Sequence, residues 1–337
     1  MNGPPSGPPS GPPSGPPGGP SQRPGGSPGL WEALPEAIEA AGTQPQAPQA
    51  MPETPWLLRL PLHSPTLPPA THTNAYLVGD KDLLVVDPGT PDEGELGRLL
   101  TLVAALRPRG RRLVGVFLTH HHVDHASGAR FLQAALGVPI LAHAATAERV
   151  GRQLGVTVNQ TVTEGELLPI GPRGSSGGLR ALHTPGHAPG HLCLHDEASG
   201  ELIAGDMVAS VGTILVHPDD DGDMRLYLAS LQRLLAAGLR RLWPAHGAAV
   251  DDPAGLLRFY ISHRLQREEK VLAALRQSAG AVQELVRVVY AETSPAVHWL
   301  AAGSLLAHLR KLQAEGRATV DEQGRWRLTE PSRTADG

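Results

Sequence analysis

The first half of the chain alternates short apolar runs with longer amphipathic segments. The apolar runs have the length of strands, which predicts strands over residues 58–62, 74–78, 83–86, 113–118 and 138–142. Apolar residues recur at helical spacing over residues 93–106 and 126–136, so we expect a helix at each place. Strands interspersed with helices in this way indicate the α/β class.

The second half continues this pattern and then changes. Strands are predicted over residues 179–183, 191–194, 201–204 and 239–243, and a helix over residues 224–237. The remaining chain predicts helices over residues 256–279, 281–290 and 297–315, followed by a hairpin of strands 318–320 and 325–328. Three helices and a hairpin are the order of a winged helix. We therefore expect one large domain over residues 55–255 and a winged-helix-like domain over residues 256–330.

The N-terminal residues 1–54 differ in composition from everything that follows. They are dominated by proline, glycine, serine and glutamine, and Gly-Pro-Pro-Ser occurs three times from Gly3. Such a segment buries too little apolar surface to offset its ordering entropy, so we expect a disordered tail. Residues 30–41 have the composition of a brief helix, although Pro35 weakens it.

Composition and charge narrow the class of protein. Apolar residues make up 40% of the chain, and the net charge of −4 gives no general attraction to nucleic acid or membrane. No apolar run approaches the roughly 20 residues that span a bilayer, and we find no secretory signal at the N-terminus. A single cysteine, Cys193, excludes an internal disulfide and fits a reducing compartment. We therefore expect a cytoplasmic protein without a membrane segment.

The charge of the C-terminal part bears on possible partners. From residue 256 onward, 12 lysines and arginines stand against 9 aspartates and glutamates, a balance of +3. Nucleic-acid binding would prefer a stronger basic patch. A lid over a site, or a contact between two copies in a homodimer, fits the segment at least as well.

Metal-binding residue types crowd into the loop after the strand at residues 113–118. The sequence there is Thr-His-His-His-Val-Asp-His, so His120, His122, Asp124 and His125 lie between a buried strand and a helix. Loops of this kind are held by a rigid scaffold and often carry function. Imidazole nitrogen and carboxylate oxygen suit zinc and related divalent ions. Since the chain direction changes here, one such loop can supply ligands to two neighbouring ions.

Three further strand ends also deliver a candidate ligand. His187 follows a strand in Thr-Pro-Gly-His, Asp206 follows one in Gly-Asp, and His246 follows one in Pro-Ala-His-Gly. Seven side chains of this kind at strand ends are difficult to explain as buried polar groups that merely satisfy one another. They predict a site for two metal ions.

Other polar residues near strand ends have weaker claims. Asp87 precedes Pro-Gly, and it is either a turn residue or a hydrogen-bond partner for a metal-bound histidine. His143 has no partner at metal spacing, so we expect a structural role. Cys193 lies within a predicted strand, and nothing marks its thiolate as stabilised, so we expect it in the core.

With these residues in place, the chain resembles the metallo-β-lactamase superfamily over about residues 56–255. The matching motifs are Thr-His-x-His-x-Asp-His, Thr-Pro-Gly-His, Gly-Asp and Pro-Ala-His-Gly. The resemblance implies a four-layer αββα sandwich with its site at one edge between two sheets. It further implies that His120, His122 and His187 hold one ion, that Asp124, His125 and His246 hold another, and that Asp206 bridges them.

A narrower resemblance, to the beta-lactamase-like protein 2 branch, covers the rest of the chain. It rests on Thr-Asn-Ala-Tyr-Leu-Val at residues 73–78, Tyr-Ile-Ser-His-Arg at residues 260–264, and Ala-His-Leu-Arg-Lys-Leu at residues 307–312. Members of this branch carry a winged-helix-like domain; some cleave single-stranded RNA, and related fungal members hydrolyse polyketide thioesters on carrier proteins. His121 and the acidic stretch 219–223 depart from the branch, and we expect both to border the substrate groove.

These observations predict a dinuclear, zinc-dependent hydrolase. The hypothesis is that a hydroxide shared by two ions attacks a carbonyl or phosphorus centre, and that Asp124 orients it and accepts its proton. An ester or thioester substrate stands level with single-stranded RNA, for which Arg310 and Lys311 would provide salt-sensitive contacts. Two alternatives are a non-catalytic nucleic-acid or partner-binding protein with a vestigial metal site, and an oxidoreductase that uses iron or another divalent metal.

Overall fold

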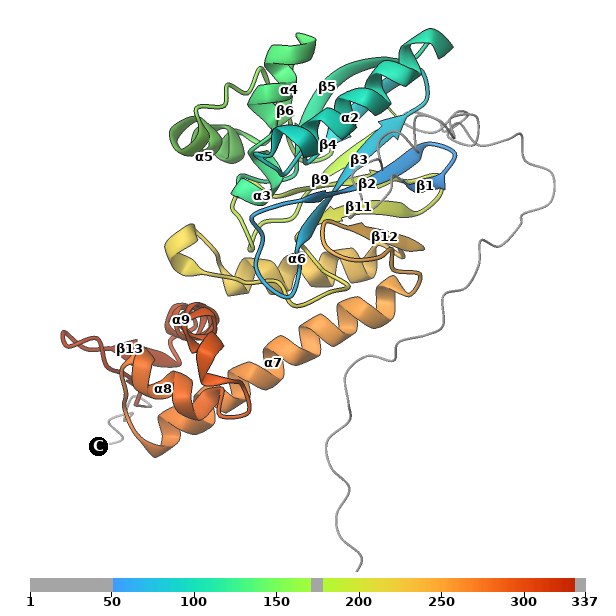
Figure 1. Cartoon of the computed structure of the whole chain (residues 1–337). Coiled ribbons are helices and arrows are strands. Elements are labelled where there is room, and N and C mark those ends of the chain that lie inside the picture. Colours follow the sequence, from blue (N-terminus) through green and yellow to red (C-terminus); the bar gives the residue numbers. More distant parts are fainter. Residues whose placement is uncertain (1–50, 171–177, 331–337) are drawn as a thin grey trace, which may run out of the picture.

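Two sheets lie face to face, and helices cover the outer face of each (Figure 1). The computed structural model describes residues 51–170 and 178–330. The predicted tail over residues 1–50, with its brief helix at 30–41, lies outside the described residues. Within the described ranges, no helix has the length and apolarity that crossing a membrane requires.

The first sheet contains seven strands in chain order. They are β1 (Met51–Thr54), β2 (Leu57–His63), β3 (His72–Gly79), β4 (Asp82–Val86), β5 (Arg112–Leu118), β6 (Ile140–Ala142) and β7 (Gln160–Thr161). The pairs from β1 to β4 are antiparallel, and those from β4 to β7 are parallel. Helices α2 (Glu93–Leu106), α4 (Ala129–Leu136) and α5 (Ala144–Leu154) provide the crossovers that parallel strands require.

The second sheet has the strand order β12-β11-β10-β9-β8. Its strands are β8 (Leu167–Leu168), β9 (Leu179–His183), β10 (Leu192–Asp196), β11 (Glu201–Gly205) and β12 (Arg241–Pro244). β11 and β12 are parallel, because α6 (Met224–Ala236) connects them, and the other pairs are antiparallel. β9, β11 and β12 therefore all point the same way and end at one edge of the sheet.

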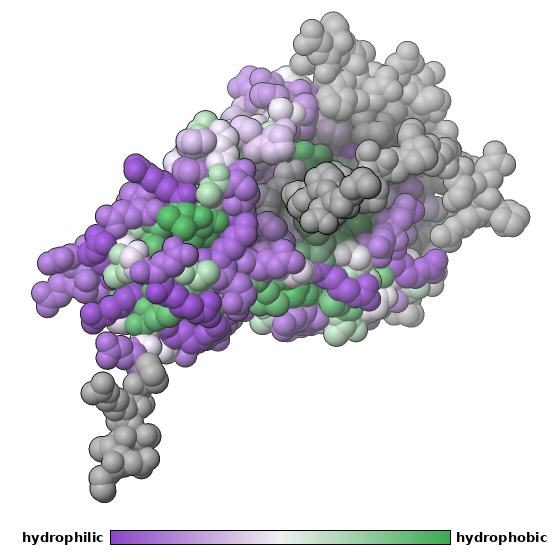
Figure 2. All heavy atoms as spheres, turned by 90° about the horizontal axis from the view of Figure 1, so that it is seen from below, coloured by the Kyte–Doolittle hydropathy of each residue, from purple (hydrophilic) through white to green (hydrophobic). Residues whose placement is uncertain are grey.

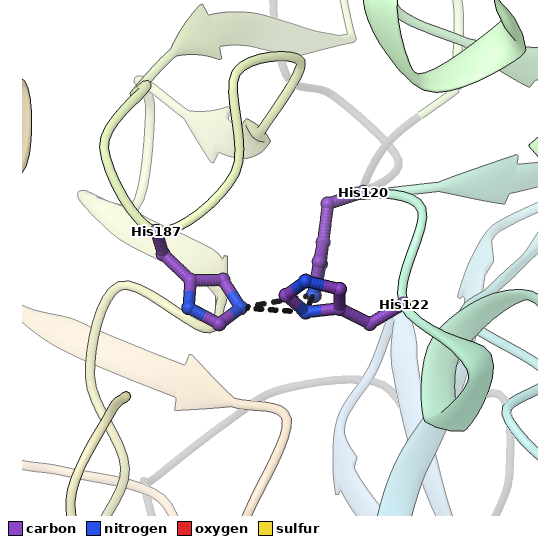
Figure 3. A group of neighbouring side chains, drawn as sticks. All are labelled: His120, His122 and His187. Carbon is purple, nitrogen blue, oxygen red and sulfur yellow. Dashed lines mark hydrogen bonds between the residues drawn. The ribbon is translucent and has the colours of Figure 1, made fainter. Parts of the chain in front are cut away.

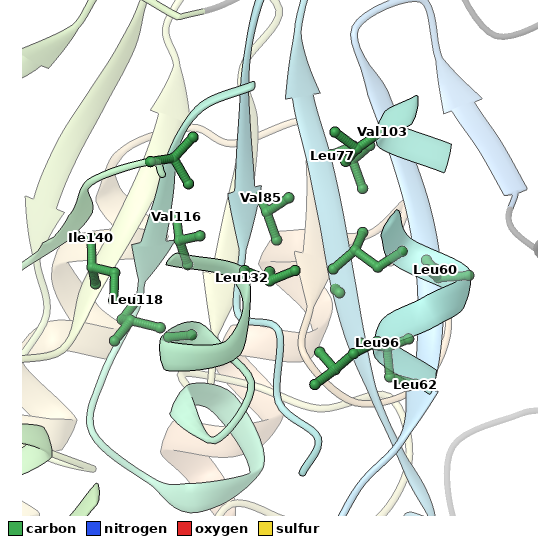
Figure 4. Packing of buried hydrophobic residues seen from close by; sticks show 14 of the residues in the cluster. Leu60, Leu62, Leu77, Val85, Leu96, Val103, Val116, Leu118, Leu132 and Ile140 are labelled. Atoms are coloured by element: carbon green, nitrogen blue, oxygen red, sulfur yellow. The ribbon is translucent and has the colours of Figure 1, made fainter. Parts of the chain in front are cut away.

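Separate apolar clusters fill the spaces between the layers. One cluster packs α2 and α4 onto the first sheet, with Leu60, Leu77, Val85 and Leu96 among its members (Figure 4). A second lies between the sheets and includes Phe117 and Trp243, and a third packs α6 and the start of α7 (Pro253–Gln277) onto the second sheet. Three stacked cores separate four layers, so the predicted αββα sandwich is confirmed.

The C-terminal helices have a core of their own. α7, α8 (Val282–Val289), α9 (His298–Ala314) and the hairpin β13 (Ala318–Val320) to β14 (Trp326–Leu328) enclose it. The order is the predicted winged helix. α7 is shared between the domains, because Leu257 packs against the second sheet's helices and Leu275 packs inside the C-terminal core. Apolar residues on the face seen in Figure 2 form separate patches and not one continuous surface.

Some local predictions were wrong. Met51–Thr54 was assigned to the disordered tail, but it pairs with β2 as the edge strand β1. The helix expected over residues 126–136 is interrupted at Ser127-Gly128, which separates α3 (Val123–Ala126) from α4. α5 and the strands β7 and β8 were not predicted. The strands are only two residues long, and α5 has few strongly apolar residues, with only Thr146 and Val150 buried.

Candidate metal centre

The strand ends of both sheets meet at one edge, and the seven candidate ligands gather there. His120 and His122 follow β5, Asp124 and His125 lie on α3, and His187, Asp206 and His246 follow β9, β11 and β12. They fall into overlapping groups whose ligand atoms lie within 4.8 Å of one another. Because the parallel strands point the same way, residues separated by more than a hundred positions converge.

Three histidines form the first group (Figure 3). His122 Nδ1 lies 2.9 Å from His120 Nε2 and 2.9 Å from His187 Nε2, and the latter two atoms are 3.2 Å apart. Each ring nitrogen presents either one proton or one lone pair, so three nitrogens that meet at one point cannot all satisfy one another. A cation that accepts three lone pairs satisfies them all.

The second group contains Asp124, His125 and His246, with Asp206 between the groups. His246 Nε2 lies 3.6 Å from Asp124 Oδ2 and 3.4 Å from Asp206 Oδ1. Asp206 Oδ1 is also 3.6 Å from His125 Nε2, while its other oxygen is 3.5 Å from His187 Nε2. One carboxylate therefore faces both groups, as a bridging ligand would.

The donor set fits divalent metal ions. Ligand atoms bound tetrahedrally at about 2.0–2.1 Å lie roughly 3.3–3.4 Å apart, close to the separations in both groups. His125 Nε2 and Asp206 Oδ1 are buried without a hydrogen-bond partner in the described residues. Burying a polar atom without a partner costs free energy. The 3.6 Å between these two atoms is the separation expected when both bind the same cation.

The ring nitrogens that face away from the centre are held by acceptors. His120 Nδ1 lies 3.0 Å from Thr119 Oγ1, and this hydroxyl donates to Asp87 Oδ2 at 2.6 Å. Asp87 Oδ2 also lies 2.8 Å from His125 Nδ1, a contact that belongs to the second of the two roles considered for Asp87. These contacts fix both ring orientations and keep the inner nitrogens aimed at the centre.

Backbone carbonyls hold two more rings. His187 Nδ1 donates to the carbonyl of Leu215 at 2.7 Å, and His246 Nδ1 donates to that of His72 at 3.0 Å. With the inner nitrogen aimed at the centre and the outer one donating, each ring is the tautomer that a metal ligand requires.

The turn that carries Asp87 is built for close approach. A Cβ on Gly89 would lie 1.6 Å from the carbonyl oxygen of Asp124, so only glycine allows the turn to approach α3. Asp87 itself has φ of 49°, a left-handed conformation that aspartate tolerates better than most residues. The turn thus fixes Asp87 against Thr119 and His125.

The electrostatic environment differs between the two groups. Burial, together with His125 and His122, lowers the pKa of His120 well below its usual value, and burial lowers that of His187 to about 4. Burial also lowers the pKa of His125. Three carboxylates outweigh this effect and raise the pKa well above its usual value; they belong to Asp206, Asp124 and Asp87. His120 and His187 therefore offer neutral rings, and the second group concentrates the carboxylate charge that attracts a cation.

His191 is a site residue that the sequence reasoning did not identify. It is fully buried; its Nδ1 lies 2.8 Å from Thr184 Oγ1, and its Nε2 accepts the backbone N–H of Asp206 at 3.0 Å. It therefore fixes the backbone at the bridging carboxylate. The only signal was a second histidine four residues after His187, at the start of a strand.

The two departures from the branch lie together. His121 is buried and is not among the described residues that line the cavity, so the prediction that it borders the groove was wrong. From the acidic stretch 219–223, Asp220 lines the cavity, and its carboxylate is 3.4 Å from His121 Nε2.

The residues expected to be structural have structural contacts. His143 caps α5 by accepting the N–H of Ala145 at 3.2 Å, and it stacks on His183. Cys193 is buried, and this burial raises the pKa of its thiol to about 12. A thiol with such a pKa is not a nucleophile at neutral pH.

A cavity of about 370 Å³ opens beside the candidate ligands and contacts Asp124, His187 and Asp206. Residues 65–70 form one wall and residues 211–215 another, and most of their side chains are apolar or uncharged. The described lining contains no lysine or arginine. The cavity is suited to an uncharged group.

Fold and donor set together define a class of metal-dependent enzymes built on an αββα sandwich. The chain belongs to the metallo-beta-lactamase superfamily, whose family model matches residues 68–246. A model for the beta-lactamase associated winged helix domain matches residues 281–326. The predicted superfamily, its beta-lactamase-like protein 2 branch and the two-domain fold are confirmed.

Named relatives extend this assignment. A beta-lactamase-like protein 2 homolog from Drosophila melanogaster is 28% identical over 259 residues, which cover 74% of this chain and 85% of the relative. An atrochrysone carboxyl ACP thioesterase from Claviceps purpurea is 30% identical over 256 residues, which cover 74% and 76%. Together with the family, these relatives support a metal-dependent hydrolase.

A solved structure shares the fold over most of its length. The crystal structure of a metallo-beta-lactamase family protein from Thermus thermophilus matches with a TM-score of 0.68 at 24% identity. The match covers 81% of this chain and 99% of that one, so the two-domain arrangement is common to both.

Proposed function

We propose that the protein is a dinuclear zinc hydrolase that cleaves an acyl thioester or ester. The observation that carries this proposal is the convergence of seven metal-binding side chains beside a cavity without cationic lining. An acyl thioester or ester presents an uncharged electrophilic carbonyl, which matches these walls. Relatives named as thioesterases on an acyl carrier protein point to the same substrate class.

In this proposal, His120, His122 and His187 hold one ion and Asp124, His125 and His246 hold the other, with Asp206 between them. When bound, two divalent cations lower the pKa of a coordinated water to about 7 and neutralise the charge that develops on the substrate. Nitrogen and carboxylate donors without a thiolate suit zinc, although the same donors also bind iron.

Asp124 is the proposed catalytic residue. Its side chain is 14% exposed and lines the cavity, so one carboxylate oxygen can reach a water beside the substrate. There it orients the water and accepts its proton. The outward contacts of His120, His125, His187 and His246 keep the rings in place, and the apolar walls exclude bulk water.

The structure weakens the case for RNA. Lys311 is 9% exposed, and its Nζ lies 2.7 Å from Glu268 and 2.7 Å from Glu315. Arg310 lies 3.7 Å from Asp219. The two residues proposed to contact RNA are thus beside carboxylates, and neither they nor any other described lysine or arginine lines the cavity. A non-catalytic nucleic-acid-binding role loses the same support. The predicted cytoplasmic location and homodimer stay predictions.

A substrate screen tests the proposal. We expect the metal-loaded full chain to hydrolyse acyl thioesters or esters with little dependence on salt, because an uncharged substrate makes no ion pairs with the protein. The same preparation is offered single-stranded RNA and β-lactams at low and high salt. Salt-sensitive cleavage of RNA alone would contradict the proposal.

A further inference from the structure

The connecting loop, residues 207–223 between β11 and α6, links the three-histidine group to the C-terminal domain. Within it, Asp220 Oδ2 lies 2.6 Å from His122 Nε2, the nitrogen that faces away from His120 and His187. His122 Nε2 is buried, and its direction does not meet the angular requirement of a hydrogen bond, so the contact is a close electrostatic one between the carboxylate and the outer nitrogen of the ring.

We propose that Asp220 is a positioning residue for His122, and that the C-terminal domain holds Asp220 in place. The affinity of the three-histidine group for its ion then depends on contacts between the domains. This inference rests on the metal site of the proposed function, and it is independent of the reaction catalysed there.

The same loop also positions His187. The carbonyl of Leu215 accepts from His187 Nδ1 at 2.7 Å. Two of the three histidines are therefore oriented by one segment, one through a carboxylate and one through a carbonyl. His120 is oriented differently, through Thr119 and Asp87 within the first sheet. A displacement of the loop would therefore affect His122 and His187 together.

Two residues of α7 anchor the first part of the loop. The hydroxyl of Tyr260 accepts the N–H of Ala209 at 3.0 Å and contacts its carbonyl at 3.1 Å. The buried guanidinium of Arg264 donates to the carbonyl of Ile214, the residue before Leu215. Both partners are backbone groups, so the contacts fix the course of the chain and not only a side chain.

Helix α9 anchors the part that carries Asp220. The ring of His217 caps the short helix η2 (Pro218–Asp220) by accepting the N–H of Asp219 at 3.1 Å. That ring lies directly against Gly303, where an added Cβ would meet His217 Cδ2 at 2.1 Å. Since Gly303 belongs to α9, this close packing transmits the position of the C-terminal domain to Asp220.

The first test compares D220N with D219N on the full chain. Asparagine keeps the size of aspartate and removes its charge, and the Asp220 side chain is 48% exposed, so the fold should persist. We expect D220N to bind one of two Zn²⁺ ions about 10–100-fold more weakly, in competition with a chromophoric chelator. D219N removes the same charge one residue earlier, at a side chain that is 69% exposed. It also removes the exposed ion pair with Arg310 of α9, 3.7 Å long, but such pairs contribute little, so D219N should bind like wild type.

The melting temperature separates positioning from a structural role. We expect D220N and wild type to melt alike when metal-free, and D220N to melt lower when both are held at limiting Zn²⁺. Affinity equal to that of D219N would overturn the assignment of Asp220. The assignment would also be overturned if D220N melted below wild type by the same amount in the metal-free state as at limiting Zn²⁺.

The second test changes a residue of the C-terminal domain. G303A adds a methyl group that must displace His217, whereas G97A adds one on α2 where no atom lies within 4 Å. We expect G303A to lower the affinity for one of the two Zn²⁺ ions and G97A to leave the affinity for both unchanged. Unchanged affinity in G303A would overturn the role of the C-terminal domain. Wild-type protein that binds no Zn²⁺ would overturn this inference and the proposed function together.

Discussion

Replacing Asp124 by alanine is expected to lower kcat/KM for the hydrolysed thioester or ester by about 10³-fold or more. The variant loses the carboxylate that orients the water and accepts its proton, and it also loses one donor to the second ion. Stability should change little in the metal-free protein, because the Asp124 carboxylate lies 3.6 Å from His246 Nε2 and 3.9 Å from His125 Nε2, beyond hydrogen-bond distance. Initial rates and thermal melting measure both effects.

The matched control is Asp251→Ala, which removes an exposed carboxylate paired with Arg241 at the start of β12, the end of that strand opposite to His246. Exposed ion pairs contribute little, so this variant should keep wild-type activity. Asp124→Asn adds a finer comparison, because it keeps the shape and removes the base. Normal turnover in Asp124→Ala would refute the role assigned to this residue.

Removal of metal is expected to have a comparably large effect. Prolonged chelation should abolish turnover and lower the melting temperature, because an ion that binds only the folded state stabilises it by about 4 kcal/mol when its concentration is 1,000 times Kd. Zn²⁺ is then titrated back while the activity is assayed at each point. Activity should rise until two equivalents of Zn²⁺ have bound per chain.

Asp206→Ala provides the comparison for that experiment. Its carboxylate faces both groups, with oxygens 3.5 Å from His187 and 3.4 Å from His246. Without it, a second equivalent of Zn²⁺ should fail to restore activity. Turnover in wild-type protein that persists after complete removal of metal would contradict a metal-dependent reaction.

Much of the site was predictable because its residues occupy strand ends. A buried strand has a strong local signature in its apolar run, and a histidine or aspartate directly after it is conspicuous. In parallel strands these ends meet at one edge, so His120, His187 and His246 could be grouped before their distances were known. The same reasoning offered Asp87 as a hydrogen-bond partner of a histidine in the site, with a turn residue as the alternative.

Other features depend on contacts that no local pattern encodes. His191 directly precedes β10, a position without a distinctive pattern. Its role appears only when β10 lies beside β11 and its ring meets the N–H of Asp206. Asp220 lies in an acidic stretch that the sequence placed beside the substrate groove, without indicating a partner for any one residue of it. Its contact with His122 depends on the path of the connecting loop, which α7 and α9 fix.

The winged helix shows the same contrast between features with a local sequence pattern and contacts between distant residues. Its helices and hairpin follow from periodicity and turn residues, so their order was predicted correctly. The pairing of Lys311 with Glu268 was not predicted, because Glu268 lies on a different helix, α7. Glu315, one turn along α9, also lies 2.7 Å from Lys311. A lysine counted as a candidate RNA contact is therefore largely buried.

The most direct measurement is anomalous X-ray diffraction from crystals of the Zn²⁺-loaded protein, recorded on both sides of the zinc absorption edge. Our account predicts two anomalous peaks per chain, one among His120, His122 and His187 and one among Asp124, His125 and His246, with Asp206 beside both. A single peak, or zinc bound elsewhere with these side chains unliganded, would contradict it.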